Sequence, residues 1–391
     1  MEESESKASE SVDRYRRLSE QNPATFLPRL ALALSGLGIQ LAKAGRHQEA
    51  VEPSEEAVAV CRRLAEQDPA AYRSDLALAL SHLGLRLAEA GRPQEAVEPT
   101  EQALGLYRVL AEQDPAAYLP DLARLLHNFG NRLAQVDRRP EAVEPIEQAV
   151  AIRRRLAEQD PAGYRRHLAV ALSSLGARLT EVGRQQEAVE AFEQEVDLYR
   201  ALNQQDPAAY LPDFALALSG LGHRLGRAGR PQEGLEATGQ AVAIRRRLAE
   251  QDPAADRLLS LAYALSNLGI QLAEAGRHQE AMAPSEEAVA VCRRLAEQDP
   301  EARLSDLARE LWFFAWVRVT GMLELDRALA AVEESMRIYQ GLAERGPEAA
   351  DPNLRRARGT WAAVLEAMGR GAEADDVPRV LDRPAVADEP S

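Results

Sequence analysis

The sequence is poor in the residues that build disulfide frameworks and metal centres. Only two of its 391 residues are cysteine and six are histidine. The histidines are scattered without a second ligand at metal-binding spacing, and two cysteines do not make a zinc site. We therefore expect no disulfide scaffold, no metal and no cofactor.

Basic residues are also in the minority. The chain has 47 Lys and Arg against 62 Asp and Glu, which gives a net charge of −15. Such an acidic chain is a poor match for the phosphate backbone of nucleic acid or for an anionic membrane. No apolar run approaches the length of a membrane span, and the acidic start Met-Glu-Glu-Ser-Glu is unlike a signal peptide. We therefore expect a cytoplasmic protein that binds neither nucleic acid nor membrane.

Catalytic constellations are lacking too. No β-strand is expected, so no glycine-rich phosphate loop follows a strand. Carboxylate pairs such as Glu286 and Glu287 fall on exposed helix faces, where they are typical of solvated charge. We expect no catalytic residues, and hence a protein that is not an enzyme.

What the sequence does contain is a long repeat. A proline preceded by Asn, Asp or Gly opens each unit, with spacings of 46 residues five times and then 47 twice. These prolines are Pro23, Pro69, Pro115, Pro161, Pro207, Pro253, Pro300 and Pro347. A fixed period of this size indicates a solenoid, in which stacked units bury one another's apolar faces. One elongated domain is therefore expected.

Each repeat is predicted to hold two helices. In the second repeat an apolar stripe at i, i+4, i+7 and i+11 marks the first helix: Leu76, Leu80, Leu83 and Leu87. Gly91 suits the left-handed residue that ends a helix. A second helix follows from about Gln94 to Ala111, and Asp114 with Pro115 starts the next unit as N-cap and first helical residue.

A proline inside the second helix needs an explanation. Pro99 lies several residues after Pro93, and proline in a helix interior costs about 3 kcal/mol. We expect a bend at Pro99 that burial between repeats outweighs. The alternative is that this helix begins nearer Val97.

These motifs resemble the tetratricopeptide repeat, in particular long-period members such as those of kinesin light chain. The family's Leu-Gly position is filled by Leu37-Gly38, Leu83-Gly84, Phe129-Gly130, Leu175-Gly176, Leu221-Gly222 and Leu268-Gly269. Its small residue on the second helix is Ala50, Ala96, Ala142, Ala188, Gly234 and Ala281. The resemblance implies an all-α, right-handed superhelical solenoid of stacked antiparallel helix pairs, of a bacterial type.

The repeats predict the division of the chain. We expect a disordered start followed by a half-repeat helix in residues 1–22, with the disorder in residues 1–9. Six regular repeats span 23–299. A divergent seventh repeat spans 300–346, a capping half-repeat spans 347–376, and a disordered tail fills 377–391. Cys61 and Cys292 occupy the same slot in repeats one and six, and we expect both to pack in the core.

The resemblance also implies a binding surface, because the first helix of each repeat lines the concave groove in this family. Positions beside the Leu-Gly pair that point away from the leucine stripe are candidates for contact with an extended peptide or a partner helix. They are Ser81, His82, His127, Asn128, Asn131, Ser173, Ser174, Ser219, His223, Ser266 and Asn267.

A row of arginines runs beside these positions. It consists of Arg86, Arg132, Arg178 and Arg224. Guanidinium groups in a row can hold the carboxylates of a peptide. Alternatively, the arginines neutralise neighbouring glutamates, in particular Glu89 and Glu181.

Two tryptophans are the last candidates. Trp312 and Trp316 lie at i and i+4 on the first helix of the seventh repeat, on the side expected to face the groove, and tryptophan is enriched at binding hot spots. Alternatively, they pack under the C-terminal cap.

The sequence thus predicts a non-catalytic protein-interaction scaffold that binds a protein or peptide in the groove. One alternative is the ligand-sensing part of a bacterial signalling or defence system. Another is a structural protein that self-associates through its end repeats.

Overall fold

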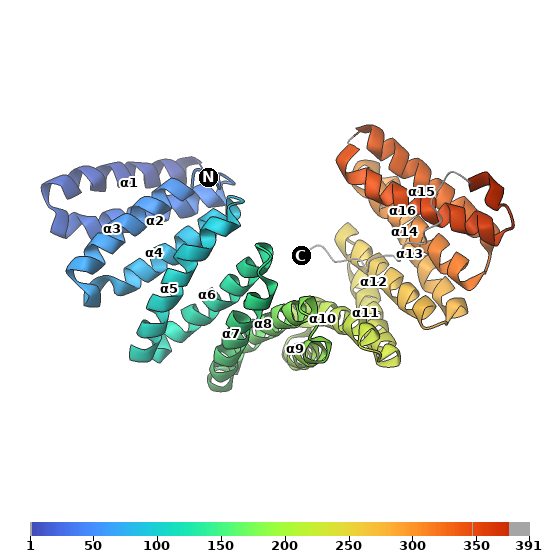
Figure 1. Ribbon diagram of the computed structural model, residues 1–391, viewed down its shortest axis with the longest axis horizontal. Helices are drawn as coiled ribbons and strands as arrows, with labels where there is room; N and C mark the ends of the chain where they lie inside the picture. The colour runs from blue at the N-terminus through green and yellow to red at the C-terminus, as the bar shows by residue number, and fades with distance from the viewer. Residues whose placement is uncertain (1, 346, 375–391) are drawn as a thin grey trace. The chain divides into compact units, whose positions relative to one another are not determined.

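The computed structural model describes residues 2–345 and 347–374, and within these ranges it contains helices and no strand (Figure 1). The helices of the first half are α1 (Glu2–Gln21), α2 (Pro23–Lys43), α3 (Val51–Gln67), α4 (Pro69–Glu89), α5 (Pro93–Gln113), α6 (Pro115–Gln135), α7 (Arg139–Gln159) and α8 (Pro161–Glu181). Those of the second half are α9 (Gln185–Gln205), α10 (Pro207–Arg227), α11 (Pro231–Gln251), α12 (Ala255–Glu274), α13 (His278–Gln298), α14 (Pro300–Gly321), α15 (Leu325–Arg345), α16 (Pro347–Ala367) and a short 3₁₀ helix, η1 (Gly371–Ala374).

The even-numbered helices open the repeats and are called A helices, and the odd-numbered ones are called B helices. Consecutive helices pack against each other from α1 to α8 and from α10 to α16, and several successive A helices also touch, as α2 with α4 and α6 with α8. This arrangement confirms the predicted all-α solenoid of stacked helix pairs. The chain divides into two compact units, Met1–Glu195 and Val196–Ser391.

The A helices begin where the sequence predicts. A side-chain oxygen of the residue before the proline accepts a backbone N–H of the first turn, as in the 3.1 Å bond from Ala117 N to Asp114 Oδ1. This contact satisfies one of the N–H groups that a helix start leaves unpaired. From α2 to α14 the exception is α12, which begins at Ala255, so that the Asp252 side chain caps no helix start. The extra residue of this repeat therefore lies in the loop before the helix, residues 252–254.

Small residues bring the two helices of a repeat close together. A Cβ built on Gly130 of α6 would lie 2.7 Å from the carbonyl oxygen of Ala142, and 2.4 Å from Cγ1 of Ile146. Ala142 and Ile146 are both fully buried on α7. A larger residue at Gly130 would force α6 and α7 apart, which explains the glycine there.

The helix that holds Pro99 is continuous. Helix α5 begins at Pro93, so the alternative start near Val97 is wrong. Pro99 is buried inside the helix. The bend that we expected at Pro99 stays a prediction.

The first residues differ from expectation. Helix α1 begins at Glu2, so the acidic segment for which we expected disorder is helical. Val12 of α1 packs on Leu30 and Leu34 of α2, which gives this half-repeat an apolar contact with the first full repeat. The predicted disordered tail, 377–391, lies outside the described residues.

Helix α2 is the one described helix that is long and apolar enough to cross a membrane. A third of that apolar stretch is buried by packing in the repeat array. The cytoplasmic location stays a prediction.

Both cysteines lie in the core, as expected. Cys61 and Cys292 are free thiols with 2% and no exposed surface respectively. Burial raises the pKa of Cys61 to about 12, which disfavours the reactive thiolate.

Candidate functional site

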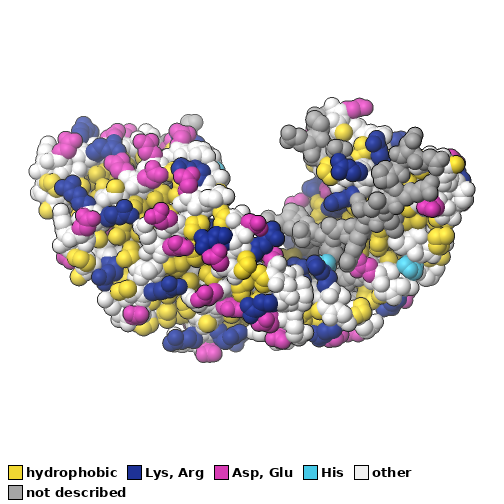
Figure 2. Space-filling model, viewed as in Figure 1, with side chains coloured by type: hydrophobic (Ala, Val, Ile, Leu, Met, Phe, Trp, Pro, Cys, Tyr) yellow, Lys and Arg dark blue, Asp and Glu magenta, His cyan; other side chains and the backbone are white. Residues whose placement is uncertain are grey.

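The A helices of the first unit expose a row of apolar side chains. Leu32 is 67% exposed, Leu78 38% and Val170 40%, and each lies nine residues after the proline that opens its repeat. We call these residues, together with the polar side chains one turn further along the same helices, the A-helix face. In the second unit Leu216 holds the same position and is 48% exposed. Figure 2 shows exposed hydrophobic surface between acidic and basic side chains on the side of the first unit turned to the viewer.

The sequence analysis missed this row. Leu78 falls between the leucines of the core stripe, and in an apolar helix it was indistinguishable from them. The recurrence of a large apolar residue outside that stripe, nine residues after Pro23, Pro69, Pro161 and Pro207, was the available signal.

Most of the predicted polar residues beside the row are half-buried. These are His82, His127, Asn128, Asn131, Ser173, Ser174, Ser219 and His223. Ser81 is buried, with 3% of its surface exposed. The A-helix face thus combines half-buried small polar groups with apolar side chains that are more exposed.

His127 is held in a cluster of polar side chains. Its Nε2 lies 3.2 Å from Asn131 Nδ2, and its Nδ1 lies 3.5 Å from Nη1 of Arg153 on α7. Burial and the Arg153 charge lower the pKa of His127 to about 4. The ring is therefore neutral at physiological pH and acts here as a hydrogen-bonding group. Burial and the Arg86 charge likewise lower the pKa of His82.

Two residues of the arginine row pair with glutamates of their own helices. Arg86 is 8% exposed and its Nη1 lies 2.9 Å from Glu89 Oε2, and Arg178 makes the same contact with Glu181 at 2.9 Å. These are the glutamates that the alternative interpretation named.

Arg132 has a different partner. It is 5% exposed and donates from Nη1 to Thr100 Oγ1 of the preceding repeat at 2.5 Å. Burial lowers its pKa to about 10, although Glu89 opposes the shift. The guanidinium groups of Arg86 and Arg132 therefore belong to the packing of the first unit. Arg224, in the second unit, is half-buried.

In the last repeats the corresponding face is covered by the chain's own side chains. Tyr263 of α12 and Arg309 of α14 hold the place of Leu78, and the Arg309 guanidinium lies 3.9 Å from the Tyr263 ring centre. Ser266 is buried and donates a hydrogen bond to the buried Glu310, and Asn267 is 4% exposed. Contacts between α12 and α14, and between α14 and α16, accompany this closure.

Both tryptophans lie in the core of the second unit. Trp312 is 2% exposed and donates from Nε1 to Thr360 Oγ1 of α16 at 2.8 Å. Trp316 is 6% exposed. The arrangement matches packing under the C-terminal cap, and the two indoles offer no surface to a ligand.

An all-α array with an open face on successive A helices defines a helical-repeat interaction module. The tetratricopeptide repeat family matches five segments, residues 30–70, 76–116, 122–162, 168–208 and 261–301. These segments make up more than half of the chain, which therefore belongs to this family. Proteins of the family are generally non-catalytic scaffolds. A search of curated proteins gave no match.

Solved structures share the fold. The crystal structure of BtubC from P. vanneervenii is 21% identical, with a TM-score of 0.49 over 63% of this chain and 91% of that one. Repeats of a putative kinesin light chain from Podosopora anserina are 23% identical, with a TM-score of 0.45 over 57% of this chain and 96% of that one. A signal-transduction ATPase with a tetratricopeptide repeat sensor from Pyrococcus horikoshii is 13% identical, with a TM-score of 0.52 over 96% of this chain and 51% of that one.

Proposed function

We propose that the chain is a scaffold that binds a peptide or a partner helix on the A-helix face of the first unit. The row formed by Leu32, Leu78 and Val170 carries this proposal. The exposed Arg124 holds this position in the third repeat, so the apolar residues of the face adjoin each other on α2 and α4, and exposed apolar patches rimmed by polar residues mark interaction sites.

The polar part of the face supports the same reading. His82, Asn128 and Ser174 lie one turn after the apolar row, thirteen residues from the proline of their repeats, and are half-buried. Amide, hydroxyl and neutral imidazole groups can donate to and accept from a peptide backbone. The apolar row would then supply contact area, and the polar groups would set the register of the ligand.

The test uses peptides selected from a random phage-displayed library on the intact chain. Selected peptides are titrated against wild type, against L32E/L78E, and against the control V109E. Val109 is 39% exposed but lies on the B helix α5. We expect L32E/L78E to weaken binding at least tenfold and V109E to leave the affinity unchanged. Equal affinities for all three proteins would contradict the proposal.

Two alternatives make different predictions. The first alternative is a ligand sensor, and the fold shared with the P. horikoshii ATPase that carries a repeat sensor supports it. A sensor requires an effector partner whose activity responds to the bound peptide. A self-associating structural protein requires oligomers of the intact chain. Light scattering that shows a monodisperse monomer at micromolar concentration would reject self-association.

A further inference from the structure

Two grooves on the B-helix side of the first unit are copies of one site. The first groove, about 560 Å³, lies between α1 and α3 over α2, and the second, about 440 Å³, lies between α3 and α5 over α4. Every residue that lines the second groove lies 46 residues after a residue that lines the first. The grooves therefore repeat with the period of the chain, and the residues of α2 and α4 that line them are not those of the A-helix face.

Each groove has an apolar floor and an acidic rim. Leu80, Leu83 and Leu87 of α4 form the floor of the second groove, and Glu95 and Glu98 lie on its rim. Among the lining residues, three carboxylates face one guanidinium in the second groove and five face two in the first. The grooves thus combine a net negative charge with an apolar base.

The buried prolines of the B helices add to this acceptor character. Pro53 lines the first groove and Pro99 the second, four residues after Glu49 and Glu95. Because proline has no N–H, the carbonyl oxygens of these two glutamates cannot receive the usual helical hydrogen bond. The carbonyl oxygens of Glu49 and Glu95 therefore add hydrogen-bond acceptors to the rim carboxylates.

A third groove, in the second unit, lies at the same place in its repeat. It lies between α13 and α15 over α14 and measures about 430 Å³. There Arg318, eighteen residues after Pro300, stands at the place of Leu87, which lies eighteen residues after Pro69. Phe314 likewise replaces Leu83 on the floor, and Glu286 matches Glu55 in a nearly identical stretch of sequence.

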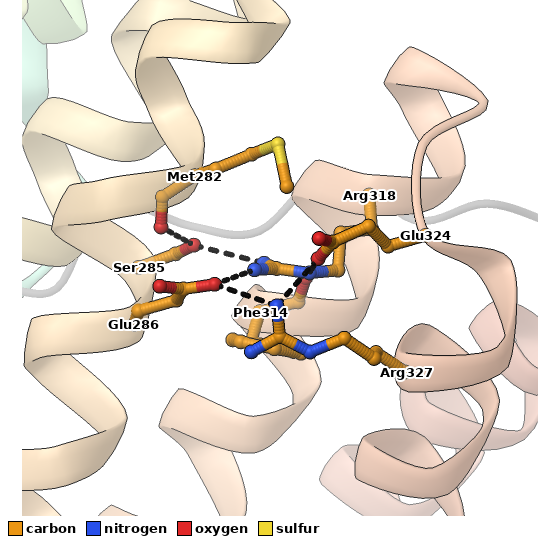
Figure 3. A network of polar contacts seen from close by, with 7 residues as sticks. All are labelled: Met282, Ser285, Glu286, Phe314, Arg318, Glu324 and Arg327. Carbon is orange, nitrogen blue, oxygen red and sulfur yellow. Dashed lines mark hydrogen bonds and ion pairs between the residues drawn. The ribbon is translucent and has the colours of Figure 1, made fainter.

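At the edge of this third groove the chain packs a buried guanidinium of its own against two lining residues, Phe314 and Glu286 (Figure 3). The Arg318 guanidinium lies 3.4 Å from the Phe314 ring centre and donates to Glu286 Oε1 at 2.7 Å and to Glu324 Oε2 at 3.1 Å. Arg327 adds a second ion pair with Glu286 at 2.9 Å. An arginine head group stacked on an apolar floor and paired with a rim carboxylate therefore fits a groove of this design.

We propose that the two grooves of the first unit bind arginine side chains of a basic segment of a partner protein. Leu41 and Leu87, at the repeat position of Arg318, line these two grooves and bring no guanidinium of the chain to their rim carboxylates. The acidic lining opposes an acidic peptide, and the net charge of −15 disfavours a second copy of this chain. Arginine fits better than lysine because its guanidinium pairs with a carboxylate through two donors and is more weakly hydrated, which suits an apolar floor.

The test uses an acetylated, fluorescein-labelled decapeptide of alternating arginine and alanine, with lysine and glutamate versions for comparison. Fluorescence anisotropy measures affinity for the intact chain, and methyl NMR shifts of Leu37, Leu83 and Leu78 locate the site. We expect shifts at Leu37 and Leu83 but not at Leu78. The arginine peptide should bind about threefold more tightly than the lysine peptide, because only a guanidinium pairs with a carboxylate through two parallel donors, and the glutamate peptide should not bind.

Variants with equal net charge separate the grooves from general acidity. E52Q/E98Q removes one rim carboxylate from each groove, and E66Q/E112Q removes two exposed carboxylates from the same helices, α3 and α5. We expect E52Q/E98Q to weaken the arginine peptide about fivefold and E66Q/E112Q to leave it unchanged. Equal loss in both variants, shifts confined to Leu78, or tight binding of the glutamate peptide would overturn the proposal. Shifts confined to Leu78 would place the peptide on the A-helix face instead, and the other outcomes leave that face to its separate test.

Discussion

Arg132 of α6 donates a hydrogen bond to the hydroxyl of Thr100 of α5, so that one buried charge joins the third repeat to the second. The hydroxyl in turn donates to the carbonyl oxygen of Ala96 at 2.7 Å. The Arg132 guanidinium has little access to water, so the stability of this contact between α5 and α6 depends on the hydroxyl of Thr100 that accepts its hydrogen bond.

The first prediction concerns that acceptor. Thr100→Val keeps the volume but leaves the Arg132 guanidinium with a missing partner, and should lower the free energy of unfolding by about 2 kcal/mol. Thr238→Val is the comparison, because Thr238 bonds a neutral partner, Gln271, at 2.9 Å and should cost about 1 kcal/mol. Urea unfolding followed by circular dichroism measures both. A smaller loss of unfolding free energy for Thr100→Val than for Thr238→Val would contradict the claim that Thr100 stabilises a buried charge.

The second prediction is a loss of stability in acid through His127. Its folded-state pKa of about 4 lies below the usual value of 6.5, so the unfolded chain takes up the proton first as the pH falls. The stabilising effect is complete above pH 6.5 and is lost between there and pH 4, by about 2 kcal/mol from pH 7 to pH 5. His127→Gln should remove this part of the dependence in urea titrations at the two pH values. If wild type and variant lose stability in parallel, His127 is not responsible.

The third prediction compares aspartates that precede a proline. Asp114→Ala removes the cap of α6 and should cost about 1 kcal/mol. Asp252→Ala should cost less than about 0.5 kcal/mol, because the Asp252 side chain caps no helix start and faces the exposed Arg257 at 3.4 Å. Thermal or urea unfolding distinguishes the two. Equal losses of unfolding free energy in the two variants would mean that Asp252 stabilises the loop before α12 as much as Asp114 stabilises the start of α6.

The fourth prediction contrasts two helical glycines. Gly130→Ala should destabilise by about 2 kcal/mol or more, because its Cβ would overlap Ile146 and the Ala142 carbonyl. Gly105→Ala should stabilise by about 0.5–1 kcal/mol, because Gly105 lies inside α5 with nothing within 4 Å of the added Cβ. Opposite signs in unfolding experiments are the expected result, and a stabilising Gly130→Ala would contradict the close approach of α6 and α7.

The sequence by itself determined the architecture. The spaced prolines, their aspartate caps and the 3.6-residue apolar period are local signals, and each is repeated often enough that helix order and pairing followed from them. Local signals do not predict the start of α12. The Asp252-Pro253 dipeptide is the same as in other repeats, but the added residue of this repeat moves the helix start to Ala255.

Only the tertiary structure decided which side chains remain available. A helical period shows which residues share a face, but not whether a neighbouring helix covers that face. Arg132 and Trp312 share their faces with candidate contact residues and are nevertheless buried, against Thr100 and Thr360. Leu78 belongs to an apolar helix and is nevertheless exposed, because the neighbouring helices pack against other sides of α4. Exposure depends on residues one repeat away or more, and that information resides in the packing of the helices.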